Sequence, residues 1–171
     1  MGLPAEYDNH RLILRILPDV HLRQGNLCEL VTPHVAAGGI SLAYVMPNLV
    51  PPLTTTDAAV QYRAELERLC PETRFLVTLF LSPELTVDEV RKAHAAGIKG
   101  VKSYPRGVTT NSGAGVESYE LYYEVFGEME KLGLVLNLHG EVPSSAPDVS
   151  NLSVYTEGRK LILMLVRISA F

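Results

Sequence analysis

Short apolar runs alternate with longer amphipathic segments along the chain, and Gly or Pro separates most of them. Continuous apolar runs rich in β-branched and aromatic residues are typical of buried strands. Five such runs predict strands at Leu12–Leu17, Ile40–Met46, Phe75–Leu81, Ile98–Tyr104 and Leu134–Leu138. Segments with helical spacing predict helices at Ala58–Leu69, Val87–Ala96 and Val116–Leu132.

Strands that alternate with helices indicate parallel strands joined by crossovers, so the expected fold class is α/β. Two architectures share this pattern. An open, doubly wound sheet of five strands fits the 171 residues. A closed (β/α)8 barrel needs about 250 residues, so this chain would be its N-terminal portion of about five βα units. Length alone does not decide between them.

Composition excludes several classes of protein. Apolar residues make up 47% of the chain and charged residues 20%, which is ordinary for a globular domain. The formal charge is −4 and no basic run occurs, which argues against nucleic acid or an anionic membrane as a partner. No apolar stretch reaches the ~18 residues of a membrane span. Two cysteines without a motif favour a reducing compartment, and we expect a cytoplasmic protein.

Polar side chains gather where the predicted strands end. Because parallel strands carry their active sites at the carboxyl edge, these side chains are candidates for one site. They are Asp19, His21, Arg23, Asn48, Lys102, Tyr104 and His139. Each taken singly has an ordinary structural explanation, since a lone histidine is usually hydrogen-bonded and a lysine at a strand end is usually solvated. Their recurrence at several strand ends is what favours a site.

The residue types suit a metal centre. Asp and His offer O and N ligands for Zn²⁺. Lys102 would become a ligand if its amine captured CO₂, because the carbamate has two anionic oxygens that can bridge two metals. Two bridged metals can activate a water and polarise a carbonyl. Arg23 could then hold a substrate carboxylate through two parallel hydrogen bonds.

Four segments carry a family resemblance: DVHLRQG (19–25), YVMPNLVPPLTTT (44–56), GIKGVKSYPRGVTTNSGAGVE (97–117) and LVLNLHGEVP (134–143). In these segments, in their order and in their spacing, the chain resembles the dihydroorotases of the amidohydrolase superfamily. The resemblance is to the single-function type of fungi and many bacteria, and it covers roughly residues 17–143. The segment VKSYP followed by GVTTNS is specific even among amidohydrolases.

The resemblance implies a (β/α)8 barrel with two Zn²⁺ ions bridged by carbamylated Lys102. It implies reversible cyclisation of N-carbamoyl-L-aspartate, a small-molecule substrate, to dihydroorotate in pyrimidine synthesis. His21 then matches the second histidine of a first-strand H-x-H pair, and His139 matches the fifth-strand metal histidine. Arg23 and Asn48 match residues that bind the substrate carboxylate, and Tyr104 matches a residue near the metals.

The sequence also departs from the family pattern. Asp19 stands where the first metal histidine is expected, as its replacement or as the aspartate that precedes it. The family's sixth-strand histidine and its general-base aspartate have no counterpart, so we assign no catalytic acid or base. Residues 144–171 diverge. We therefore expect residues 1–171 to form a single incomplete barrel domain, truncated at its C-terminus.

Two alternatives differ from dihydroorotase activity. The chain could be an inactive dihydroorotase-like fragment that does nothing or that pairs with a full-length subunit; as an enzyme, it could form a homodimer, as the family does. It could also be a hydantoinase or allantoinase, which share the metals and the carbamate. The VKSYPRGVTTNS segment and the Arg23–Asn48 pair argue against that second alternative.

Overall fold

The computed structural model describes residues 19–107 and 109–139. Strands alternate with helices throughout this part, as predicted, and no helix in it has both the length and the apolar character needed to cross a membrane. The elements in chain order are β1 (Asp19–Val20), α1 (Gly25–Val31), α2 (Pro33–Ala37), β2 (Leu42–Val45), α3 (Thr56–Leu69), β3 (Arg74–Phe80), α4 (Val87–Ala95), β4 (Gly100–Ser103), the 3₁₀ helix η2 (Glu120–Tyr122), α5 (Tyr123–Leu132) and β5 (Val135–Leu138).

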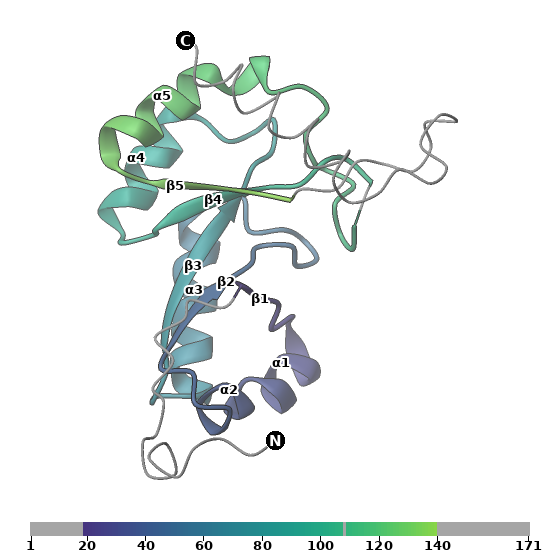
Figure 1. The fold of residues 1–171 in the computed structure, drawn as a ribbon, viewed down its shortest axis with the longest axis vertical. Coiled ribbons are helices and arrows are strands. Elements are labelled where there is room, and N and C mark those ends of the chain that lie inside the picture. Colours follow the sequence, from purple (N-terminus) through teal and green to yellow (C-terminus); the bar gives the residue numbers. More distant parts are fainter. Residues whose placement is uncertain (1–18, 108, 140–171) are drawn as a thin grey trace, which may run out of the picture.

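The five strands form one parallel sheet in the order β1-β2-β3-β4-β5. This sequential order excludes a doubly wound sheet, in which the strand order reverses at a switch point. It is instead the order of a β/α barrel. Figure 1 shows a strongly twisted sheet with α3, α4 and α5 on one side of it and α1 and α2 near β1. The prediction of about five βα units of a barrel is therefore confirmed.

Four predicted strands are confirmed to within two residues at each end. The predicted strand Leu12–Leu17 lies outside the described residues. Asp19 does not follow the first described strand but begins it, since β1 consists of Asp19 and Val20. The short helices α1 and α2 were not predicted, because each is too short to show a helical repeat.

The prediction of a helix over Val116–Leu132 is wrong for its first residues. Val116 pairs with Pro105 in an isolated bridge, donates its backbone N–H to the carbonyl of Tyr104 at 2.7 Å and accepts from the backbone N–H of Arg106 at 3.1 Å. Those contacts commit Val116 to an extended conformation. The helical segment therefore begins only with η2, and α5 follows at Tyr123.

Two threonine side chains and one glycine define three of the helix ends. The hydroxyl of Thr55 accepts a hydrogen bond from the backbone N–H of Ala58 at the start of α3, and Thr86 accepts one from Glu89 at the start of α4. After α5, Gly133 adopts φ 64°, a left-handed conformation that ends the helix at little cost only for glycine.

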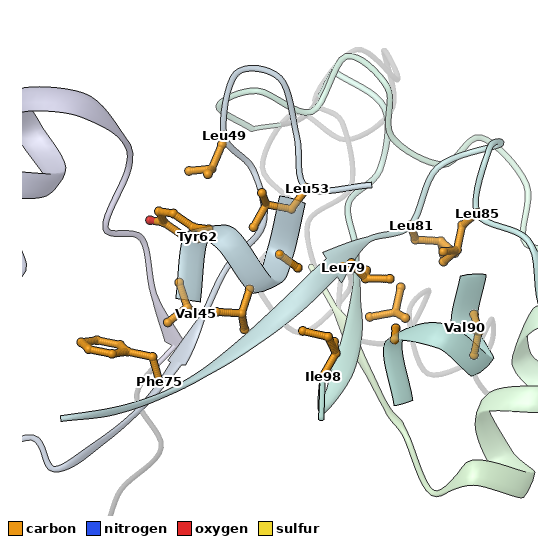
Figure 2. Close-up of a cluster of buried hydrophobic side chains, with 14 of the residues drawn as sticks. Val45, Leu49, Leu53, Tyr62, Phe75, Leu79, Leu81, Leu85, Val90 and Ile98 are labelled. Carbon is orange, nitrogen blue, oxygen red and sulfur yellow. The ribbon is translucent and has the colours of Figure 1, made fainter. Parts of the chain in front are cut away.

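The hydrophobic core lies between the sheet and its helices. On β3, alternate residues Phe75, Val77 and Leu79 belong to this core, as the two-residue repeat of a strand requires. Figure 2 shows Phe75 and Leu79 among apolar side chains from the neighbouring strands, loops and helices. The other alternate residues of β3, such as Phe80, face the opposite side of the sheet, which is the interior of the partial barrel.

Register places the candidate residues on that interior face. Asp19 pairs with Tyr44, and Lys102 pairs with both Phe80 and Asn137. Residues paired across neighbouring strands share a face of the sheet. The fold thus brings polar side chains of β1, β2, β4 and β5 to one concave surface.

Candidate active site

Asp19, His21 and Lys102 form the centre of the candidate site. Nζ of Lys102 lies 3.5 Å from Oδ2 of Asp19, and Nε2 of His21 lies 3.9 Å from Oδ1 of the same carboxylate. Asp19 and His21 point to the same side because they are two residues apart on an extended segment. Sequence reasoning expected these three side chains at one site, and the structure brings them together.

Lys102 is almost completely buried, with its side chain 6% exposed. Its ammonium also lies 5.3 Å from the centroid of the Tyr104 ring, within the range of a cation–π contact. A buried lysine is rare because desolvation opposes its charge. The amine of Lys102 therefore lies inside the candidate site, between the carboxylate of Asp19 and the ring of Tyr104, and not at the solvated surface.

Asn48 lies next to His21 and is 2% exposed. Its Oδ1 atom is 2.8 Å from Nδ1 of His21, and its Nδ2 atom donates to the carbonyl of Thr110 at 2.9 Å. The side chain of Asn111 donates to the backbone carbonyl of Asn48 at 3.0 Å. Two residues of the segment after β4 therefore hold Asn48 against the histidine.

Arg23 has an unusual backbone. Its φ is 62°, in the left-handed region that side chains other than glycine rarely adopt, and the hydroxyl of Tyr62 donates to its carbonyl at 2.5 Å. Burial raises the pKa of Tyr62, so its phenol stays a donor. The Nη1 atom of Arg23 is buried, and no hydrogen-bond partner for it occurs in the described ranges. A buried guanidinium N–H without a partner suits an anionic ligand.

Tyr104 connects Lys102 with His139. Its ring lies 5.6 Å from the imidazole of His139 and stacks on Phe80 at 5.3 Å. Its hydroxyl is buried and has no hydrogen-bond partner among residues 19–107 and 109–139. Burial raises the pKa of Tyr104, the charge of Asp19 raises it further and that of Arg23 opposes both, so the phenol is a neutral donor.

Sequence reasoning missed Tyr44 and Asn137. The hydroxyl of Tyr44 donates to Oδ1 of Asn137 at 2.8 Å, which links β2 with β5 across the interior face. Burial, with a smaller contribution from the charge of Asp19, raises the pKa of Tyr44 to about 12. Their positions were available in the sequence, because Tyr44 and Asn137 are polar exceptions within apolar strands.

The donor set can be tested against zinc. Nε2 of His21 and Oδ1 of Asp19 are 3.9 Å apart, whereas two ligands of one tetrahedral zinc, with bonds of about 2.0–2.2 Å, are about 3.4 Å apart. The two side chains would therefore have to approach each other by about 0.5 Å to share one tetrahedral ion. No group of three His, Cys, Asp or Glu side chains with metal-binding geometry occurs in the described part of the chain. These residues fit part of a zinc site, with Lys102 as the third candidate ligand only in carbamylated form.

Comparison with known proteins identifies relatives of the chain. It is 59% identical over 144 residues to the dihydroorotase of Mycosarcoma maydis, an alignment that covers 84% of this chain and 34% of that protein. The structure matches the Saccharomyces cerevisiae dihydroorotase solved with 5-fluoroorotic acid, with a TM-score of 0.80 and 43% identity over 89% of this chain and 44% of that one. No protein-family model matches the chain.

A third comparison concerns the fold alone. The L-hydantoinase of Arthrobacter aurescens superposes with a TM-score of 0.70 over 89% of this chain and 38% of that chain, at 23% identity. At that identity the match shows a shared fold. The chain spans about a third of the length of the curated relatives it matches, in their N-terminal part.

Proposed function

We propose that this chain, which is homologous to the N-terminal third of the dihydroorotases, contributes the N-terminal half of a dihydroorotase active site. The reaction is the reversible cyclisation of N-carbamoyl-L-aspartate to dihydroorotate. The observation that carries the proposal is the Asp19–His21–Lys102 cluster, with distances of 3.5 and 3.9 Å, on the interior face of a partial barrel. The 59% identity to a dihydroorotase supports this assignment over a hydantoinase.

In this proposal the metal is zinc, held by Asp19, His21, His139 and carbamylated Lys102. The bound metal supplies a nucleophilic water and polarises the amide carbonyl of the ring. The position of Lys102 supports its modification, because its amine is buried at the centre of the cluster, 3.5 Å from the carboxylate of Asp19. The imidazole of His139 lies against the ring of Tyr104, which in turn contacts Lys102. The backbone N–H of His139 donates to the carbonyl of Ser103, the residue after Lys102.

The substrate's carboxylate is proposed to bind at Arg23. The buried Nη1 atom of Arg23 can donate to a carboxylate oxygen, and the hydrogen bond from Tyr62 holds the backbone of Arg23 in place. The buried hydroxyl of Tyr104 is a second donor without a partner in the described ranges. A bound anion would accept a hydrogen bond from each of these two donors, and neither has a partner among the described residues. Asn48 is the third proposed contact with substrate.

The domain organisation, the compartment and the oligomeric state are part of the same proposal. In this proposal residues 1–171 form a single incomplete barrel domain, and the protein acts in the cytoplasm on a small-molecule substrate, as a homodimer. Cys28 and Cys70 are both buried and unbridged, which agrees with a reducing compartment. No partner of nucleic acid or membrane is proposed.

Hydrolysis of dihydroorotate tests the function directly. The purified chain is incubated with zinc and bicarbonate and compared with Lys102→Ala and with Lys92→Ala, whose exposed lysine pairs with Asp57 on the helical side of the sheet. Because the chain supplies only half of the site and no general base, each variant is assayed together with a dihydroorotase fragment that contains the remaining strands of the barrel. In this mixture we expect turnover with the unmodified chain and with Lys92→Ala, and none with Lys102→Ala. Turnover that survives Lys102→Ala, or none in any of the three mixtures, contradicts the proposed function.

A further inference from the structure

The side-chain amide of Asn48 has one possible orientation in this structure. Its Nδ2 atom faces the backbone carbonyl of Thr110 at 2.9 Å, and a carbonyl oxygen can only accept a hydrogen bond. The amide nitrogen must therefore point to Thr110, and the amide oxygen must point the other way. That oxygen, Oδ1, lies 2.8 Å from Nδ1 of His21.

The orientation of Asn48 determines which nitrogen of His21 carries the proton. An amide oxygen only accepts, so Nδ1 of His21 must be the donor of this hydrogen bond. In the neutral imidazole the other nitrogen, Nε2, then has a lone pair and no hydrogen. Nε2 is the atom that lies 3.9 Å from the carboxylate of Asp19.

We propose that Asn48 is a positioning residue that holds His21 in the Nδ1–H tautomer, so that Nε2 faces Asp19 as a ligand. This inference rests on the proposed function in one respect, namely that zinc is the ion placed between Nε2 and Asp19. A ligand histidine is commonly oriented in this way by an acceptor on its other nitrogen. The amide nitrogen of Asn48 has a second hydrogen that neither contact uses, so a contact with substrate remains compatible with this role.

The segment after β4 maintains the arrangement. Asn111 donates from its side chain to the backbone carbonyl of Asn48 at 3.0 Å, while the carbonyl of Thr110 holds the amide. Asn48 is 2% exposed, so water does not compete for its amide oxygen. The orientation of His21, which follows β1, thus depends on Asn48 and on two residues that lie 62 and 63 positions after Asn48.

Ring ¹⁵N chemical shifts of the metal-free chain measure the tautomer. The full chain is labelled at histidine and studied at about pH 8.5, well above the ordinary histidine pKa of about 6.5. His21→Gln assigns the signal among the five histidines. We expect a protonated Nδ1 and an unprotonated Nε2 for His21. A predominantly protonated Nε2 in the unmodified chain overturns the proposal.

Three variants separate positioning from folding. Asn48→Leu removes the acceptor at similar volume and is expected to shift His21 towards the Nε2–H form. Asn48→Asp keeps an acceptor and is expected to retain the Nδ1–H form. Asn26→Leu, the same substitution at an exposed position of α1, is the matched control that leaves the contact with His21 in place. An Asn48→Leu chain that is folded by circular dichroism but has an unchanged His21 spectrum overturns the proposal. If Asn48→Leu does not fold, the tautomer of His21 in the unmodified chain and in Asn48→Asp tests the proposal.

Calorimetric titration with Zn²⁺ links the tautomer to the proposed function. We expect Asn48→Leu to weaken zinc binding about 10–100-fold, as loss of such a supporting contact does elsewhere, and Asn48→Asp to weaken it less. If the chain binds no zinc while His21 has the expected tautomer, the proposed metal centre fails and the positioning role of Asn48 stands. If zinc binds equally well to all variants, the link between positioning and metal is wrong.

Discussion

Lys102 on β4 and Asp19 on β1 are 83 positions apart in the chain, yet Nζ and Oδ2 lie 3.5 Å from each other. Two strands, β2 and β3, separate them in the sheet. In a flat sheet three strand spacings would place β1 and β4 about 14 Å apart. The contact therefore requires the curvature of the partial barrel as well as three strand pairings, β1 with β2, β2 with β3 and β3 with β4.

Replacing Lys102 by Met tests whether this lysine stabilises the metal-free protein. Because a buried charge pays a desolvation cost, we expect Lys102→Met to be neutral or to raise the free energy of unfolding by about 1 kcal/mol. Asp19→Ala leaves the buried ammonium without its carboxylate and should lower that free energy by about 1–2 kcal/mol, less than for a fully buried pair because Asp19 is half exposed. Urea unfolding of the metal-free chains measures both. A strongly destabilised Lys102→Met would show that the lysine serves the fold rather than a site.

Gly100 marks the closest approach across the interior face. A Cβ at this position would lie 2.2 Å from the hydroxyl oxygen of Tyr44 and 2.5 Å from the carbonyl oxygen of Val135. Gly100→Ala should therefore lower the free energy of unfolding by about 1–3 kcal/mol. The matched control is Gly127→Ala in α5, where a Cβ meets no atom within 4 Å. That variant should gain about 0.5–1 kcal/mol from helix propensity, and equal thermal shifts of both variants would contradict the packing argument.

Tyr62 and Tyr104 differ in the environment of their hydroxyls. Tyr62→Phe removes a donor to the carbonyl of Arg23 and should cost about 0.5–1.5 kcal/mol of unfolding free energy. Tyr104→Phe removes a buried hydroxyl without a partner among the described residues, and should be neutral or stabilising. Chemical denaturation of the two variants compares them. If Tyr104→Phe is as destabilising as Tyr62→Phe, its hydroxyl has a structural partner.

The carboxyl of Glu128 should make the stability of the chain depend on pH. Hydrogen bonds from Arg91 at 2.8 Å and from Lys131 at 3.3 Å lower the pKa of its carboxyl below the ordinary value of 4.5. A lowered pKa means that the ionised form stabilises the fold, so the contribution is complete above pH 4.5 and is lost as the pH falls through the lowered value. Glu128→Gln should therefore be less stable than the unmodified chain at pH 7, and the gap should close in acid. Melting temperatures at a series of pH values show this, and a gap independent of pH would refute it.

Local patterns in the sequence determined the elements. Apolar runs located β2 to β5, and helical spacing located α3 and α4, because both periodicities depend on near neighbours. The same reasoning placed a helix too early at Val116, where a pairing with Pro105 outweighs helical spacing. The short α1 and α2 carry too few residues for a periodic signal.

The tertiary structure alone decided which chemistry-bearing residues meet and how. The sequence predicted a shared edge for Asp19, His21 and Lys102, but not that the lysine is buried, nor that His139 lies beside the ring of Tyr104. It did not indicate that Asn48 uses its amide to orient His21. Such contacts depend on sheet curvature and on loops packed from distant positions, and no local pattern encodes them. Residue types therefore indicate the chemistry, while packing over long sequence separations determines its geometry.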